Sequence, residues 1–175
     1  MLAAGGTTVR AGSLSFECQG QDAGKIMTLS VVYDGEAEGK LTGKTSFGDV
    51  SFIASKKEGE EAYEGHNRRV VAIDASGPAK VTMPDAAALD ECLTAEKNAD
   101  DPDGELALLS CVTKVPDGAA PVPADVFIKL AIDPLVFQDS AAEIRRRYTD
   151  ASTALGRKLT LEALPPLSCK SAKKE

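Results

Sequence analysis

The sequence predicts an α+β fold, with an antiparallel β-meander in the first half, closing as a small barrel or sandwich, and a helix-containing second half. Apolar and polar residues alternate repeatedly between residues 13 and 83, with turn residues between the runs, as in half-buried strands. At Pro84-Asp85 the spacing of the apolar residues changes to that of a helix. The length of 175 residues is enough for one domain, or for a core with a smaller lobe.

The first two strands carry the clearest alternation. Leu14, Phe16 and Cys18 alternate with polar residues, so Cys18 lies on the apolar face of a predicted strand. Residues 27–33 repeat the pattern, and Asp34-Gly35 has the chemistry of a hairpin turn. We therefore expect an antiparallel pair.

The following residues continue the meander. Gly48-Asp49 divides a stretch rich in Thr, Ser, Val and Phe into two predicted short strands. Two more strands are expected over residues 69–73 and 79–83, separated by a turn at Gly77-Pro78. The charged residues 56–67 are predicted to be a loop.

Helical spacing begins at Asp85, which can cap a helix that carries Cys92. This helix is expected to end at the polar run 98–104. The next apolar segment, residues 105–112, fits either a helix or a buried strand. Either form returns Cys111 toward Cys92.

The last part of the chain is predicted as strand, helix and strand. Residues 126–132 alternate, Ser140 and Glu143 have the spacing of a capping box, and an apolar stripe runs from Ile144 to Leu155. A final strand is expected near residues 159–163.

These elements predict four sections along the chain. Residues 1–12 form a flexible leader, and residues 13–115 form a β-rich core with a helical, disulfide-bearing extension. After a linker rich in Pro and Gly, residues 124–169 form a strand-helix-strand lobe packed on the core. Residues 170–175 form a flexible tail.

The four cysteines favour disulfides over metal ligands, because the chain has no Cys-x-x-Cys pair and one histidine. We predict the bonds Cys92–Cys111 and Cys18–Cys169, with the other two pairings left open. Disulfides persist in oxidising compartments, which indicates a periplasmic or secreted protein. The first residues lack the features of a signal peptide, so we expect that one has been removed.

Composition limits the classes of partner. A net charge of −7 disfavours nucleic acid, since nucleic-acid binding depends on Lys and Arg against phosphates. A protein partner, cationic by preference, is the better match. No stretch approaches the roughly 20 apolar residues that a membrane span needs.

The predicted charged loop carries the candidate binding site. Tyr and Arg are favoured anchors of protein interfaces, and acidic neighbours can steer a charged partner. The candidate binding residues are Glu58, Tyr63, His66, Arg68 and Arg69.

No motif predicts catalysis, a cofactor or a metal. His66 is the one histidine, and no Gly-x-Ser-x-Gly elbow accompanies it. Carboxylates gather around Gly104, but an EF-hand loop centred there would begin at Ala99 and end at Ser110, where acids are needed. We therefore predict no specific calcium site at residues 100–105.

Residues 14–18, 27–31 and 77–81 resemble the membrane-bound and periplasmic inhibitors of c-type lysozyme, over residues 13–92 of this chain. The resemblance implies a small exported β-barrel with a disulfide, and it would pair Cys18 with Cys92 and Cys111 with Cys169. The family places a Ser-Gly-x-x-Tyr loop in the enzyme's cleft. The comparable residues 58–63 read Glu-Gly-Glu-Glu-Ala-Tyr, and the tryptophan that the family has near residues 72–74 is missing.

Two function hypotheses follow. The first is an exported, non-catalytic binding module, with inhibition of a cell-envelope-targeting enzyme such as lysozyme as its narrower form. The alternative is an exported enzyme or metal-assisted protein that uses a cleft between the two halves.

Overall fold

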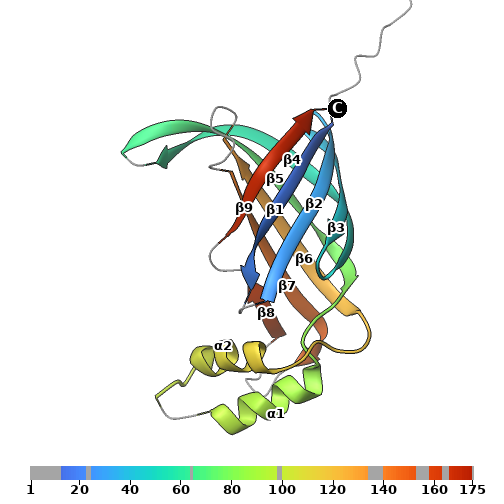
Figure 1. Ribbon diagram of the computed structural model, residues 1–175, viewed down its shortest axis with the longest axis vertical. Helices are drawn as coiled ribbons and strands as arrows, with labels where there is room; N and C mark the ends of the chain where they lie inside the picture. Colours follow the sequence, from blue (N-terminus) through green and yellow to red (C-terminus); the bar gives the residue numbers. More distant parts are fainter. Residues whose placement is uncertain are drawn as a thin grey trace, which may run out of the picture.

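The computed structural model describes residues 13–22, 25–63, 65–97, 100–133, 140–152, 158–162 and 166–174. Antiparallel strands close into an eight-stranded barrel, and a pair of helices lies across one end of it (Figure 1). This confirms the predicted fold class. The strands are β1 (Leu14–Asp22), β2 (Lys25–Gly35), β3 (Glu38–Thr45), β4 (Gly48–Tyr63), β5 (His66–Val81), β6 (Val122–Ile132), β7 (Ala141–Ser152), β8 (Lys158–Glu162) and β9 (Leu167–Lys174). The helices are α1 (Ala86–Glu96) and α2 (Glu105–Lys114).

The barrel closes through its last strands. Each strand from β1 to β7 pairs with the next, β7 pairs briefly with β9, and β9 pairs with β1. β8 pairs with the same edge of β7 as β9, further along the strand, and its Leu161 is buried in the core. Residues 124–169, predicted as a lobe, therefore contribute strands to the same sheet as β1–β5.

The barrel interior is a packed core. Every second side chain of β2 and β6 is buried, as the period of a strand requires. An eight-stranded barrel is just wide enough for side chains to fill, and here large residues fill it. Fully buried members of the core include Phe16, Leu29, Tyr33, Leu41, Ile73, Ile128, Leu130, Ile144 and Leu167.

Two turn and loop predictions in the meander were wrong. Residues 56–63 belong to β4, and Gly77-Pro78 lies within the continuous strand β5 rather than in a turn. A Cβ atom on Gly77 would lie 2.7 Å from Cδ1 of Phe52, so the glycine makes room for a core ring. The charged composition of residues 56–67 is typical of a loop, but the backbones of β4 and β5 are paired there up to Tyr63 and His66.

The helix predicted from Ser140 to Leu155 was also wrong, because residues 141–152 form β7. Ile144 and Tyr148 are four apart, a spacing that shares one face in a helix and equally in a strand. Ser140 is not a helix cap. Its hydroxyl accepts from the Asp133 backbone N–H at 3.0 Å, and its carbonyl accepts from the Cys169 N–H at 3.1 Å.

The ends of the chain differ in what the structure describes. The predicted leader, residues 1–12, lies outside the described residues. Residues 170–174 of the predicted tail belong to β9, which pairs with β1 as far as Leu14. The strand predicted near residues 159–163 is confirmed as β8, but it is not the last one.

Carboxylates begin both helices. Asp85 accepts from the Ala88 N–H at 2.9 Å, which confirms the predicted cap of α1. Asp101 accepts from the N–H groups of Glu105 and Ala107, each at 3.0 Å, and so fixes the start of α2. Residues 105–112, for which the sequence allowed either a helix or a buried strand, therefore form a helix. Neither helix has the length and apolar character needed to cross a membrane.

Buried contacts join the helix pair to the barrel end. Leu89 and Leu93 of α1 are buried in the common core. Tyr148 of β7 donates its hydroxyl to the Pro84 carbonyl, and Arg146 donates to the Thr82 carbonyl at 3.2 Å. Burial raises the pKa of Tyr148 to about 12.

Candidate functional site

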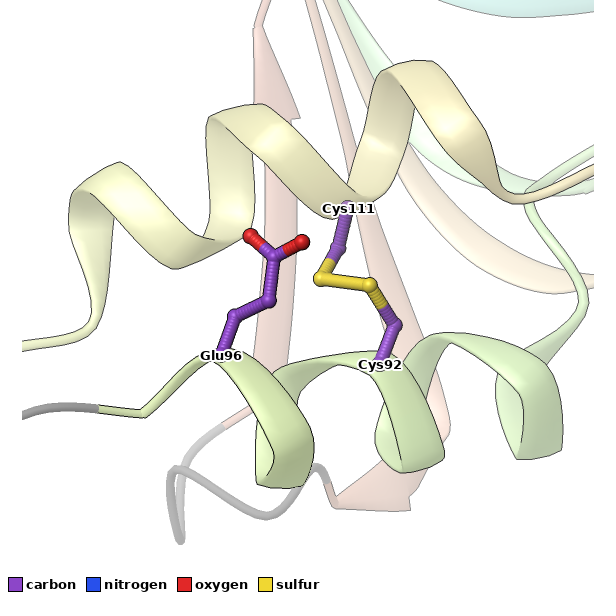
Figure 2. A group of neighbouring side chains, drawn as sticks. All are labelled: Cys92, Glu96 and Cys111. Carbon is purple, nitrogen blue, oxygen red and sulfur yellow. A yellow bond between two sulfur atoms is a disulfide. The ribbon is translucent and has the colours of Figure 1, made fainter.

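Two disulfides are present, with the predicted pairing. Cys18 on β1 is bonded to Cys169 on β9, so this bond crosses the pair of strands that closes the barrel. Cys92 on α1 is bonded to Cys111 on α2 (Figure 2). The pairing implied by the lysozyme-inhibitor resemblance is therefore not the one observed.

Glu96 lies beside the second disulfide. Figure 2 shows its carboxylate next to the sulfur atoms of Cys92 and Cys111, and one donor atom from each of the three residues lies within 4.8 Å of the others. The sulfur atoms are committed to the disulfide, whereas a metal needs thiolates. Glu96 instead pairs with Lys114, and hydrogen bonds from Lys114 and Ser110 lower the pKa of its carboxyl. The cluster is a cross-link between helices.

The longest strands extend beyond the barrel as a two-stranded ribbon. Pairing of β3 with β4 ends at Glu38–Ser55, and pairing of β5 with β6 ends at Val71–Ile132. Pairing of β4 with β5 continues to Tyr63–His66. We call residues 56–63 and 66–70 the ribbon. Its eight-residue strand spans roughly 25 Å at about 3.3 Å per residue, and Figure 1 shows the paired strands curving away from the barrel.

The five predicted binding residues all lie in the ribbon, but on different parts of it. Glu58 and Arg69 form an ion pair on one exposed face. Arg68 lies on the other face, 3.9 Å from the Asp133 carboxylate, with its side chain only 15% exposed. Tyr63 and His66 are paired backbone to backbone beside the turn, and their side chains lie outside the described part.

Arg68 and Arg69 have different structural environments, because Arg68 is mostly buried and Arg69 is exposed. Because Arg68 packs against Asp133 at the end of β6, it connects the ribbon to the barrel. Lys56 adds a second connection, with its ammonium 5.9 Å from the centre of the buried Tyr33 ring. Glu58 and Arg69, in contrast, are paired with each other at the surface.

The outer wall carries a groove that the sequence reasoning missed. It has a volume of about 500 Å³ and crosses β3, β4, β5, β6 and β7 near the base of the ribbon. Its residues are Glu38, Ile53, Ala54, Ser55, Asp74, Ala75, Ser76, Phe127, Ile128, Lys129, Glu143 and Arg145. The available signal was an apolar residue at an outward position of a strand, as at Ile53.

A smaller hollow of about 70 Å³ lies at the helix-covered end. Lys25 and Asp117 meet across its rim at 2.7 Å, and Arg146 lies 4.9 Å from the centre of the Phe47 ring. These contacts link β2, β7 and the segment after α2, so the hollow belongs to the joint between helices and barrel.

Comparison of the chain with protein-family models found no match, and neither did comparison with curated proteins or with solved structures. The fold and surface therefore define the class of protein directly. It is a filled antiparallel barrel, cross-linked by two disulfides, that carries a helix pair at one end and a projecting ribbon.

Proposed function

We propose that the protein is an exported, non-catalytic binding module that contacts a protein partner through the ribbon. The observation that supports this most is the extension of β4 and β5 past the strands on either side of them. The barrel interior is occupied by side chains, which favours binding on the outside. Two disulfides are compatible with export to an oxidising compartment.

The ribbon is costly to maintain as a purely structural element. A two-stranded hairpin alone is marginally stable in water, and its outer edges offer unpaired backbone groups. Here the Glu58–Arg69 and Arg68–Asp133 pairs support it. A supported projection with Tyr and Arg residues suits insertion into a partner surface.

The narrower form of the proposal is inhibition of an enzyme that attacks the cell envelope, such as a c-type lysozyme. Residues 58–63, which the resemblance aligns with the inhibitory loop of that family, form the outer part of β4 in the ribbon. The net charge of −7 favours a cationic partner, because opposite charges accelerate encounter.

A ribbon-shortened variant tests the proposal. Replacing residues 59–70 by Asn-Gly would join Glu58 to Val71, which are cross-strand partners, through a two-residue hairpin turn. Wild type and variant are used as baits in the native extracytoplasmic fraction, and captured proteins are quantified by mass spectrometry. We expect a partner that the wild type retains and the variant loses. Identical sets of captured proteins would contradict the proposal.

A direct assay addresses the narrower form. Wild type is added to c-type lysozyme acting on bacterial cells, and lysis should slow, whereas the shortened variant should leave the rate of lysis unchanged.

Single substitutions in the ribbon test its side chains. Tyr63→Ala should weaken binding of any captured partner by about 1 to 2 kcal/mol if Tyr63 is an interface anchor. Unchanged affinity for both Tyr63→Ala and Arg69→Ala would exclude the ribbon as the contact.

A further inference from the structure

The groove on the outer wall is built from a row of cross-strand neighbours. Glu38 pairs with Ser55, Ser55 with Asp74, Asp74 with Lys129, and Lys129 with Glu143. Five adjacent strands thus contribute one side chain each. At about 4.8 Å per strand the row is roughly 19 Å long, which an extended peptide covers with five or six residues.

Two apolar side chains stand in this groove where polar residues are expected. Ile53 is 76% exposed and Phe127 is 39% exposed. Arg147 lies 5.7 Å from the centre of the Phe127 ring and is itself bonded to Asp125 at 2.8 Å. The ring is therefore held in place on the surface, and the volume of about 500 Å³ is that of a small ligand site.

Acidic groups outnumber basic groups in the groove. Glu38, Asp74 and Glu143 face Lys129 and Arg145, and Arg145 lies 3.6 Å from Glu162 just outside. Lys40, opposite Ile53, has Asp34 on its other side. With these neighbours counted, negative charge remains in excess beside the apolar residues.

We infer that the groove is a second binding site, which takes an extended peptide segment with one bulky apolar side chain between basic residues. The apolar side chain covers Ile53 and Phe127, and the basic residues meet Glu38 and Glu143 at the two ends of the row, with Asp74 between them. Charge complementarity and exposed apolar surface select this occupant together. The site lies outside the ribbon and does not depend on the ribbon's function.

Three designed peptides test the inference against the isotopically labelled full chain by NMR titration. The basic probe is acetyl-Lys-Gly-Phe-Gly-Lys-amide. One control replaces both Lys by Glu, and the other replaces Phe by Ala. We expect saturable shifts of groove amides with the basic probe, at least fivefold weaker binding by either control, and weaker binding as salt rises.

Protein variants locate the site. The double variant Phe127→Ser with Asp74→Asn should bind the basic probe at least fivefold more weakly than wild type. The matched pair Val32→Ser with Glu17→Gln, at exposed positions of β2 and β1, should leave binding unchanged. The ribbon-shortened variant should also bind normally, which separates this site from the proposed function. Equal binding of the acidic probe, or shifts outside the groove, would overturn the inference.

Discussion

The barrel and the helix pair each contain one disulfide, but the two bonds constrain the chain very differently. Cys18 and Cys169 are 151 residues apart in sequence, whereas Cys92 and Cys111 are 19 apart. The chain-entropy relation gives about 5 kcal/mol for the long loop and about 3 kcal/mol for the short one. The first bond fastens the strands that close a sheet, and the second holds two neighbouring helices.

The largest effect is expected from opening the barrel. Cys18→Ala with Cys169→Ala should lower the free energy of unfolding by as much as about 5 kcal/mol, because the unfolded chain regains the freedom that the long loop had lost. Urea unfolding measures the difference. A loss below that of the helix-pair variant would show that pairing of β9 with β1 closes the barrel without the bond.

A smaller effect is expected from the helix pair. Cys92→Ala with Cys111→Ala should lower the free energy of unfolding by up to about 3 kcal/mol. The barrel should keep its spectroscopic signature, since Leu89 and Leu93 still pack in the core. Loss of near-UV signal across the whole molecule would mean that the helices and barrel are not separable in this way.

Exposure should separate the two bonds in their response to reductant. Cys18 and Cys169 are 3% and 1% exposed, whereas Cys92 is half-buried. A mild thiol reductant should therefore open Cys92–Cys111 first, because exchange requires access to a sulfur atom. Timed alkylation with peptide mapping follows the order. Labelling of Cys18 before Cys92 would contradict this expected order of reduction.

Paired glycine substitutions compare the barrel with the ribbon. Gly77→Ala places a Cβ against the Phe52 ring and should cost about 1 to 3 kcal/mol through overpacking. Gly59→Ala in the ribbon has no atom within 4 Å of the added Cβ. Its stability should stay within about 0.5 kcal/mol of wild type. Equal losses in thermal unfolding would contradict the packing of β5 described above.

A further loss of stability is expected at the joint between barrel and helices. Tyr148→Phe should cost about 1 to 2 kcal/mol, since the buried Pro84 carbonyl loses its donor. The raised pKa of Tyr148 favours the neutral hydroxyl in the folded state. Its contribution is therefore complete below about pH 10 and declines as the pH rises toward 12. Unfolding free energies between pH 9 and 12 should fall more steeply for wild type than for the variant.

The sequence predicted local features that depend on few residues. Alternation located β1 and β2, and Asp85 marked the start of α1. The return of the chain from Cys92 toward Cys111 favoured the pairing found in the structure. Each of these features has one dominant physical cause. The alternation follows from burial on one face, and the cap follows from an unpaired backbone N–H.

Other features depend on contacts between distant segments, which local sequence patterns do not reveal. Ile144 and Tyr148 fit the period of a helix, and only pairing of β7 with β6 decides for a strand. The charged ribbon was predicted as a loop because most of its described side chains are exposed, so no alternation of apolar residues marks a strand. The groove arises from side chains on five strands, so no local segment could predict it.

Hydrogen–deuterium exchange in the presence of the captured partner tests the central claim most directly. We expect binding to slow exchange of amides in residues 56–63 and 66–70, because no third described strand pairs with the ribbon beyond Ser55 and Val71. Amides of α1 and α2 should be unchanged. Slowed exchange confined to the helix pair, with the ribbon exchanging as it does in the free protein, would contradict the claim that the ribbon binds the partner.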